Sequence, residues 1–228
     1  MLKKEMMDIL SSSSKTGWVL EPEAKRLLSL TGIAIPRFLW ARKEEEAIKF
    51  AEKIGYPVVA KVISPKVLHK SERNGVVVDI NSDDQLIATF QRFYQIEGFA
   101  GMLVEEMVSG IELIVGGKID YQFGPVVLLG IGGTGVEIYR DVTLRMAPLA
   151  LKDIESMIKC LKAHRILEGY RGSPPIDLKE LERLLLTFSD LVMDLEKFIE
   201  SIDLNPVICS PSGCVVADAR IMLSHRDP

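Results

Sequence analysis

The order of the predicted elements indicates an α+β fold with two lobes. Between residues 18 and 100, amphipathic helical segments alternate with short apolar strands. From residue 101 onwards the pattern changes to strands divided by glycine, followed by helices and a hairpin. A chain of 228 residues is long enough for one large domain or two small lobes. We therefore expect an N-terminal arm at 1–17, a first lobe at 18–100 and a second lobe at 101–228.

Composition excludes several classes of protein. Hydrophobic residues make up 47% of the chain and charged residues 26%, which is ordinary for a globular protein. A net charge of −4 offers no basic surface for nucleic acid. The apolar runs are too short for a membrane span, which needs about 18 residues or more, and the N-terminus does not resemble a signal peptide. Three cysteines without metal-type spacing indicate a reducing compartment, so we expect a cytoplasmic protein.

The first lobe should contain three helices separated by strands. The first helix is predicted from Glu21, with proline in its first turn, to Gly32, where glycine ends it. Ser82 is a plausible cap for the third helix. The other elements are expected at 33–40 (a strand broken by proline), 43–54 (helix), 57–63 and 76–78 (strands) and 86–93 (helix).

The second lobe should begin with strands. Apolar runs predict three of them at 102–108, 111–119 and 125–129. Residues 136–146 then alternate almost perfectly, so their apolar and polar side chains should point to opposite faces of one strand. The remaining predictions are helices around 154–161 and from about Asp177, and strands at 201–209 and 214–221.

The segment 130–135 contains the spacing GxGxxG after an apolar strand, as in dinucleotide-binding folds. That function requires a helix to begin at the glycines, whereas the following residues have a period of two. We therefore interpret the glycines as a bend where backbone approaches backbone or a ligand. Such a bend is compatible with a nucleotide site of another kind, to which Gly132 and Gly133 would belong.

Asp141 and Arg145 share the polar face of the predicted strand, together with Glu137. A solvated sheet surface is the simple explanation. An arginine among acids beside a glycine bend also suits a terminal phosphate, because the planar guanidinium can donate two hydrogen bonds at once.

The C-terminal hairpin predicts a metal site. A four-residue loop at 210–213 would place Asn205 opposite Asp218, and Asp203 would share their face. Opposed Cβ atoms lie about 4.5–5.5 Å apart, and oxygen ligands at that separation suit Mg²⁺. The alternative is a strand whose polar positions simply face water.

The same register sets Cys209 opposite Cys214. A cross-strand disulfide is therefore conceivable on geometric grounds. The reducing compartment expected for this chain argues against it.

Lys61 lies on an apolar strand with no acid nearby in sequence, so it must reach solvent or meet an anion. Glu105 and Glu106 stand at a predicted strand end, and Glu112 begins the next strand. Acids at such a hinge could accept hydrogen bonds from an adenine amino group or a ribose hydroxyl.

His69 lies in a cationic loop beside Lys66, Lys70 and Arg73. A lone loop histidine is usually a solvated side chain. Neutral imidazole is also a competent nucleophile near its ordinary pKa of about 6.5, and the surrounding cations would favour a phosphoryl group.

Taken together, these segments resemble an ATP-grasp domain, in particular the β chain of ADP-forming acetyl-CoA synthetases (acyl-CoA:ADP ligases). The resemblance runs from about Trp18 to Ile221. It rests on nine ordered segments: Thr31–Pro36, Pro57–Lys61, Ser64–Ser71, Val104–Met107, Glu112–Gly116, Phe123–Gly133, Asp141–Leu149, Asp203–Pro206 and Ala217–Arg220. One departure is Asn74-Gly75, where relatives often carry two glycines; asparagine tolerates left-handed geometry, so the departure bears only on the flexibility of the loop.

The resemblance implies a two-lobed fold that holds ATP or ADP and Mg²⁺ between its lobes. Lys61 would bind phosphate, Glu105–Val108 would form the adenine hinge, and His69 would be a phosphohistidine on a mobile loop. The full set implied is Lys61, Lys70, Ser71, Glu105, Glu106, Met107, Val108, Glu112, Gly132, Gly133 and Asp141 for nucleotide, Asp203, Asn205 and Asp218 for Mg²⁺, and His69 and Arg145 for catalysis. For Arg145 this means a contribution of about 10³–10⁵ in rate.

In such enzymes a separate α chain binds CoA and the acyl substrate and makes acyl phosphate. The β chain passes the phosphoryl group through its histidine to ADP, within an expected α2β2 assembly. One alternative is an ATP-grasp carboxylate ligase, succinyl-CoA-synthetase-like or acyl-phosphate-forming, that needs no phosphohistidine in this chain. Another alternative is a non-catalytic nucleotide-sensing subunit.

Overall fold

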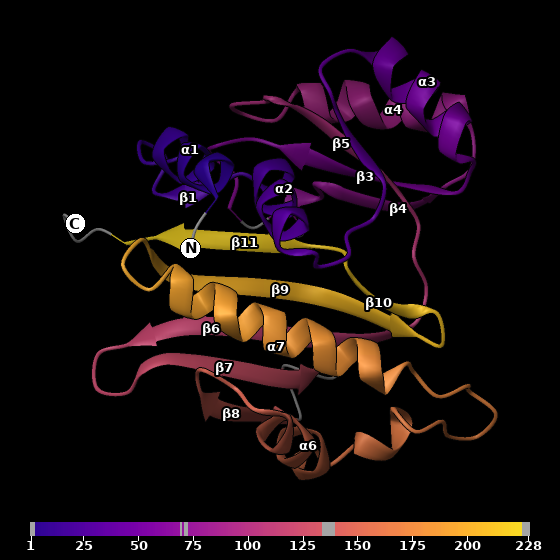
Figure 1. The fold of residues 1–228 in the computed structure, drawn as a ribbon. Helices are drawn as coiled ribbons and strands as arrows, with labels where there is room; N and C mark the ends of the chain where they lie inside the picture. Colours follow the sequence, from indigo (N-terminus) through magenta and orange to yellow (C-terminus); the bar gives the residue numbers. More distant parts are fainter. Residues whose placement is uncertain (1–2, 69, 71–72, 134–139, 225–228) are drawn as a thin grey trace. The chain divides into compact units, whose positions relative to one another are not determined.

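The computed structural model describes residues 3–68, 70, 73–133 and 140–224. The chain forms two compact units (Figure 1). Unit 1 consists of Met1–Ile35 and Ser109–Pro228, and unit 2 of Pro36–Val108. These bounds differ from the expected division near residue 100, because the segment before Pro36 joins the sheet of unit 1, and the strand at Gly101–Glu106 is central to the sheet of unit 2.

Unit 2 is a four-stranded antiparallel sheet covered on one face by two helices. The strand order is β2-β5-β3-β4. Its elements are β2 (Phe38–Ala41), α3 (Glu44–Ile54), β3 (Val58–Ile63), β4 (Val76–Ile80), α4 (Asp83–Tyr94) and β5 (Gly101–Glu106). The expected strand at 33–40 forms only from Phe38, since proline interrupts it. The Ser82 hydroxyl accepts a hydrogen bond from the Gln85 amide, which confirms the predicted cap.

The core of unit 2 lies between the helices and one face of the sheet. Val58, Ala60 and Val62 of β3 belong to a single buried cluster with residues of α3 and α4. Because successive strand residues point to opposite faces, Lys61 lies on the face away from these helices. One face of β3 therefore contributes to the core, and the other face of the same strand carries Lys61.

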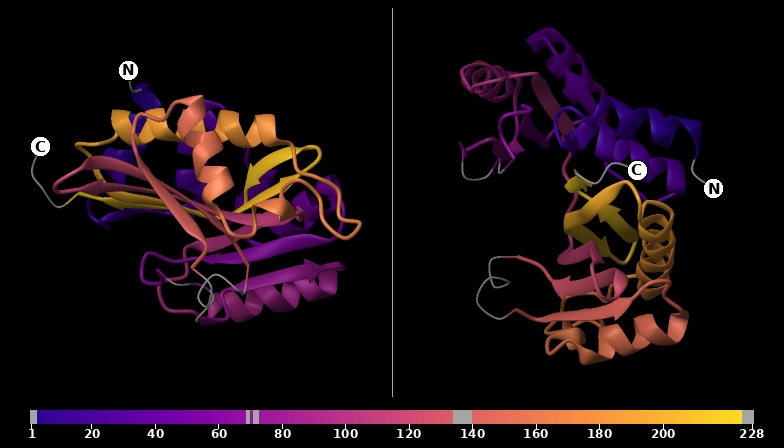
Figure 2. Two further views of the ribbon diagram at one scale, coloured as in Figure 1. Left: turned by 90° about the horizontal axis from the view of Figure 1, so that it is seen from below. Right: turned by 90° about the vertical axis from the view of Figure 1, so that its left-hand side faces the viewer.

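Unit 1 is built on a seven-stranded sheet with the order β1-β11-β9-β6-β7-β8, in which β10 also pairs with β9. Helices α6 and α7 lie on one side of this sheet (Figure 2). The elements are α1 (Lys4–Ser12), β1 (Trp18–Val19), α2 (Glu21–Thr31), β6 (Ile111–Asp120), β7 (Gly124–Ile131), β8 (Val142–Met146), α6 (Leu151–Cys160), the 3₁₀ helix η2 (His164–Ile166), α7 (Leu178–Asp194), β9 (Ile199–Ser210), β10 (Gly213–Val216) and β11 (Ala219–Leu223).

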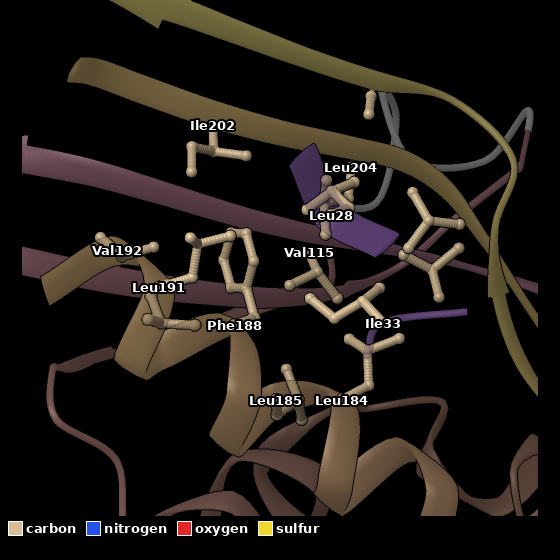
Figure 3. Packing of buried hydrophobic residues seen from close by; sticks show 14 of the residues in the cluster. Leu28, Ile33, Val115, Leu184, Leu185, Phe188, Leu191, Val192, Ile202 and Leu204 are labelled. Carbon is tan, nitrogen blue, oxygen red and sulfur yellow. The ribbon is translucent and has the colours of Figure 1, made fainter. Parts of the chain in front are cut away.

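A large apolar core fills the space between this sheet and its helices (Figure 3). Val115 and Leu204 come from the strands, whereas Leu184, Phe188 and Val192 follow one face of α7 at helical spacing. All of them are less than 5% exposed. One face of the sheet therefore packs against the core, and both α6 and α7 lie on that side.

The N-terminal segment is more ordered than an arm. Residues 4–12 form α1, and Met6, Ile9 and Leu10 are buried in the core of unit 1. Their spacing follows the helical period. The helix was not predicted from the sequence, in which a run of four serines follows these apolar residues; the serines lie at the C-terminal end of α1 and in the following turn.

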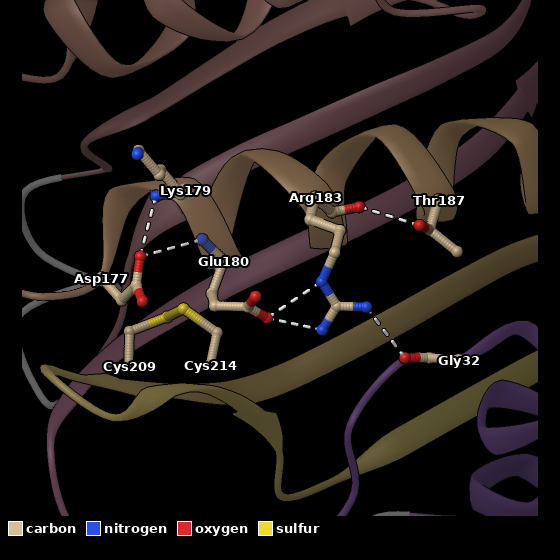
Figure 4. Close-up of polar contacts among 8 residues, drawn as sticks. All are labelled: Gly32, Asp177, Lys179, Glu180, Arg183, Thr187, Cys209 and Cys214. Carbon is tan, nitrogen blue, oxygen red and sulfur yellow. Dashed lines mark hydrogen bonds and ion pairs between the residues drawn. A yellow bond between two sulfur atoms is a disulfide. The ribbon is translucent and has the colours of Figure 1, made fainter.

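Helix α7 begins where predicted. Asp177 caps it by accepting hydrogen bonds from the Lys179 and Glu180 amides at 3.0 and 3.1 Å (Figure 4). Next to it, Cys209 and Cys214 face each other across β9 and β10 and are joined by a disulfide. The expected register is therefore confirmed, whereas the expectation of reduced thiols is wrong. Within the described part of the chain, no helix is long and apolar enough to cross a membrane.

Candidate active site

Five of the predicted site residues lie on the face of the large sheet opposite α6 and α7. Pairing places Gly116 opposite both Asp203 on β9 and Leu128 on β7, and Leu128 opposite Leu144 on β8. Neighbours across a ladder point to the same face. The alternate residues, such as Val115 and Leu204, point into the core. We call this surface the open face; its predicted site residues are Glu112, Gly132, Asp203, Asn205 and Asp218.

Asn205 and Asp218 occupy opposed positions on this face. The Asn205 amide donates to the Asp218 carbonyl oxygen at 3.2 Å, in register with the β9–β11 ladder. Asn205 is exposed and Asp218 half-buried. The predicted turn is two residues shorter than expected, since Ser210 pairs with Gly213, yet the register is unchanged. The sequence therefore predicted correctly which positions oppose each other.

Asp203 lies two residues from Asn205 and is held by an arginine. Across the ladder it faces Arg220, whose Nη2 donates to Asp203 Oδ2 at 3.1 Å. Burial raises the pKa of the Asp203 carboxyl; Arg220 opposes this shift and the charge of Asp218 adds to it. Asp203 thus has a cationic partner across the ladder.

The donors on the open face fit Mg²⁺ in part. Asn205 and Asp218 supply the amide and carboxylate oxygens that Mg²⁺ prefers. No group of three or more His, Cys, Asp and Glu side chains that could hold a metal ion occurs in the described residues. An ion bound here would therefore take its other oxygens from water or phosphate, which is how Mg²⁺ is commonly bound beside nucleotides.

Glu112 meets the glycine bend on the same face. The Gly132 amide donates to the Glu112 carbonyl oxygen at 2.7 Å, and a Cβ at Gly132 would lie 2.7 Å from that oxygen. Gly133 has φ +84, a left-handed conformation suited to glycine. The interpretation of these glycines as a close backbone approach is confirmed; the rest of the GxGxxG segment, 134–135, lies outside the described residues.

Asp141 and Arg145 lie away from the open face. Arg145 pairs in register with the core residue Val127, and its Nη2 donates to Ser156 Oγ of α6 at 2.7 Å. The Asp141 carboxylate is buried and accepts from the Lys162 and Ala163 amides at 2.8 and 2.9 Å. Asp141 and Arg145 therefore lie on the side of the sheet where α6 packs. This placement argues against Arg145 as a partner of Asn205 and Asp218.

In unit 2, Lys61 and Glu105 form a buried ion pair. Lys61 opposes Leu103 and Glu105 opposes Val59, so both side chains project from the same face of neighbouring strands. Lys61 Nζ lies 2.6 Å from Glu105 Oε1, and the two residues are only 5% and 2% exposed. The anion that Lys61 requires is therefore provided at least in part by an acid distant in sequence.

The other hinge residues differ from one another. The Glu106 carboxylate accepts from the Arg37 amide at 2.9 Å and from Arg37 Nε at 2.5 Å, so it anchors the start of β2. Met107 is 37% exposed and follows the end of β5, and Val108 is half-buried at the last position of unit 2. Glu105 and Glu106 are thus committed to different cations.

His69 and Ser71 lie outside the described residues, so the structure gives no geometry for either. Their described surroundings include Lys70, whose carbonyl oxygen accepts from the Gly75 amide at 2.8 Å. A Cβ at Gly75 would lie 2.6 Å from Val62 Cγ1, which requires glycine. Asn74 has φ 50. Asn74 therefore adopts a left-handed conformation, which asparagine tolerates.

Sequence reasoning overlooked two arginines. Arg220 opposes Asp203 in the same register that pairs Asn205 with Asp218, so the hairpin pattern contained enough information to find it. Arg37 could not be found in this way, because its partner Glu106 lies 69 residues away in sequence.

Comparison with known proteins gives concordant results. A family model described as an ATP-grasp domain matches residues 11–223. The β subunit of acetate–CoA ligase [ADP-forming] I from Pyrococcus furiosus is 40% identical over 213 residues, covering 90% of this chain and 91% of that protein. Acetate–CoA ligase [ADP-forming] I from Archaeoglobus fulgidus is 42% identical over 217 residues, covering 92% of this chain but only 32% of that longer protein.

A solved structure shares the fold along nearly the whole chain. It is the dinucleotide-forming acetyl-coenzyme A synthetase 1 of Ca. Korarchaeum cryptofilum in complex with coenzyme A and Mg-AMPPCP, with its phosphohistidine segment pointing towards the nucleotide-binding site. The TM-score is 0.84 at 39% identity, covering 96% of this chain and 100% of the matched chain. This chain therefore belongs to the ATP-grasp domain family and, within it, to the β subunits of ADP-forming acetate–CoA ligases.

Proposed function

We propose that this chain is the nucleotide-binding β subunit of a two-chain ADP-forming acyl-CoA synthetase. It would take the phosphoryl group of an acyl phosphate onto His69 and transfer it to ADP, giving ATP. The observation that carries the proposal is the open face, which brings together Glu112, Asn205 and Asp218 in a chain that belongs to the ATP-grasp domain family. This function deepens the family assignment, which by itself names only the class of ligase.

The proposed reaction balances in three steps. On the partner chain, acyl-CoA and inorganic phosphate give acyl phosphate and CoA. The imidazole of His69 then attacks phosphorus, the bond to the acyl oxygen breaks, and the free carboxylate leaves. Finally a β-phosphate oxygen of ADP attacks the phosphohistidine, which restores the imidazole and forms ATP. No oxidant or reductant is required, and each bond broken is matched by a bond formed.

On the open face, Asn205 and Asp218 would hold Mg²⁺ through their side-chain oxygens. Bound Mg²⁺ supplies charge neutralisation to the phosphate oxygens and helps to align them. Gly132 brings the backbone of the bend against Glu112 with no side chain between them, so Glu112 is positioned by backbone contacts. We propose that Glu112 accepts a hydrogen bond from a ribose hydroxyl.

Lys61 is proposed as a phosphate ligand whose position is set by Glu105. A lysine ammonium buried without an acid would lose its proton readily, because burial disfavours its charged form. The 2.6 Å contact to Glu105 favours the charged form that a phosphate ligand must have. This pairing leaves the adenine hinge to the backbone of 105–108 rather than to the carboxylates of Glu105 and Glu106, both of which already contact cations.

The partner would be an α chain that carries the CoA and acyl chemistry, in an α2β2 assembly. The two relatives support this. The P. furiosus β subunit has nearly the same extent as this chain, whereas in A. fulgidus the matching region is 32% of a longer protein. The further domains of that longer protein would correspond to the separate partner of this chain.

The decisive experiment is phosphoryl labelling. Wild-type chain, His69→Ala and Asp218→Ala are incubated with γ-labelled ATP and Mg²⁺, and the protein-bound label is tested for the acid lability and base stability of a phosphohistidine. We expect label on wild type and none on His69→Ala. His164→Ala is the matched control, because His164 lies in η2, where its Nδ1 is 2.8 Å from the Leu161 carbonyl oxygen.

A different result would favour another function. If no protein-bound label forms while the complete two-chain enzyme remains active, the chain is an ATP-grasp ligase without a phosphohistidine. If nucleotide binds but His69→Ala and Asp218→Ala both leave the activity of the complex unchanged, the chain is a non-catalytic nucleotide-sensing subunit. Label that persists in His69→Ala and disappears in His164→Ala would move the carrier role to the other histidine.

A further inference from the structure

We propose that Arg220 is a positioning residue of the Mg²⁺–nucleotide site: it holds Asp203 out of the metal coordination, so that Asn205 and Asp218 form the binding pair. The inference rests on the proposed function of the open face. Arg220 then acts on the site through Asp203, and Asp203 is no longer one of the three metal ligands predicted from the sequence.

The geometry places the two pairs side by side. Arg220 on β11 is directly opposite Asp203 on β9, with Nη2 3.1 Å from Oδ2. Two residues along β9, which is about 6.6 Å for an extended strand, Asn205 stands opposite Asp218. All four side chains emerge from the open face, because residues two apart on a strand share a face. Arg220 therefore contacts Asp203 directly across the ladder, beside the pair formed by Asn205 and Asp218.

Charge explains why this contact matters. Asp203 and Asp218 would both present carboxylates to a ligand that carries several negative phosphate charges. In the partly buried setting of Asp203, whose side chain is 36% exposed, that repulsion is screened less than at a fully exposed site. Pairing with Arg220 offsets the charge of Asp203 and so lowers the repulsion between Asp203 and the phosphates of a nucleotide bound beside it.

Two simpler roles for Arg220 fit the arrangement less well. An ion pair with a third of each side chain exposed contributes little to folding stability, so stability alone gives no reason for an arginine beside the proposed ligands. Arg220 could instead contact phosphate directly, but its guanidinium already donates to Asp203, and turning it towards a ligand would leave Asp203 uncompensated.

The test is a double-mutant cycle read out by equilibrium binding. The full chain carrying Arg220→Met, Asp203→Asn or both changes is titrated with a fluorescent ADP analogue, with Mg²⁺ and again with EDTA, and each variant is first shown to be folded by its thermal transition. We expect Arg220→Met to weaken Mg²⁺-dependent binding by tenfold or more. The double variant should return to within threefold of wild type, and Asp203→Asn alone should bind at least as tightly as wild type. Arg220→Lys should restore part of the loss.

The outcomes separate this inference from the function on which it rests. If the double variant binds as weakly as Arg220→Met, Arg220 touches the nucleotide itself and the positioning role is wrong. If Arg220→Met binds like wild type, the pair has no role in the site. If Asp218→Asn keeps full Mg²⁺-dependent binding, the proposed metal site on the open face fails, whatever the Arg220 variants do.

Discussion

Strands β8 and β9 of the same sheet use the same alternating pattern in opposite ways. In β9, apolar residues such as Leu204 point to the helices and polar residues such as Asp203 point to the open face. In β8, Leu144 and Met146 are 54% and 61% exposed on the open-face side, and Arg145 turns towards α6. Alternation therefore shows which residues share a face; neighbouring elements decide which face is covered.

Position in the sheet explains the difference. Strand β9 is central, between β11 and β6, with α7 packed against its core side. Strand β8 is at the edge, and the chain continues from it directly into α6, whose Ser156 accepts from Arg145. A polar side chain can face a helix at such an edge, because a partner within the helix satisfies it. As a result, Asp203 and Asn205 of β9 lie on the open face, whereas Arg145 of β8 lies on the side of α6.

The largest expected effect is a difference in stability between substitutions of Leu204 on β9 and Leu144 on β8. Leu204→Ala should lower the free energy of unfolding by about 2–5 kcal/mol, because Leu204 is fully buried and a cavity remains. Leu144→Ala should change it by about 0.5 kcal/mol or less, because that side chain is already half in water. Urea denaturation of the two variants measures the difference, and equal losses would show that the outer side of β8 is covered in solution.

Asp141→Ala is expected to act on stability rather than on nucleotide binding. The buried carboxylate accepts two backbone amide hydrogen bonds, and its loss leaves those amides without their acceptor. A hydrogen bond to a charged group contributes about 1.5–3 kcal/mol, so we expect a loss of that order in denaturant titration. Asp141→Asn, which keeps one acceptor, is the matched control. A loss of ADP affinity without a loss of stability would return Asp141 to the binding site.

Arg145→Ala should reduce turnover of the two-chain enzyme by less than tenfold. The family resemblance by itself led to an expected loss of about 10³–10⁵, but the guanidinium is held against Ser156 on the helix side. Arg145→Lys and Ser156→Ala serve as controls for the packing of α6. A loss of a thousandfold or more in Arg145→Ala, with normal thermal stability, would contradict the assignment of this side chain to the helix face.

The smallest effect concerns the turn between β6 and β7, the strand on which β8 pairs. The amides of Gln122 and Phe123 donate to the Asp120 carboxylate and lower its pKa from 3.8. A lowered folded-state pKa contributes stability above pH 3.8 that is lost as the pH falls through the folded value. Asp120→Asn should therefore lower the urea midpoint slightly at pH 6 and by less at pH 2.5. A difference that is the same at both pH values would contradict this account.

Much of the fold could be read from local signals. Gly32 ends α2 in a left-handed conformation, Asp177 caps α7, and the cysteine register of the hairpin is correct. Each of these follows from chemistry within a few residues. Helix α1 was missed because the run of serines at 11–14 obscured the helical spacing of Met6, Ile9 and Leu10. That spacing becomes decisive only when tertiary packing buries the three side chains.

The candidate site divides in the same way. The opposition of Asn205 and Asp218 follows from a short hairpin, so counting residues was enough to predict it. The pairing of Lys61 with Glu105 joins strands more than 40 residues apart in the printed sequence, and no local pattern encodes such a contact. The contact of Arg145 with Ser156 could not be predicted for the related reason that the side of a sheet covered by a helix depends on the path of the chain.

The discontinuity of unit 1 has a consequence for biosynthesis. Strand β1 pairs with β11, so Trp18 and Val19 are made well before their sheet partners Met222 and Ile221. Unit 2 is a single continuous segment with its own core and can form earlier, since domains generally fold as units during synthesis. The segment that carries Asn205 and Asp218 is therefore made after unit 2, together with the strand that pairs with the N-terminal residues.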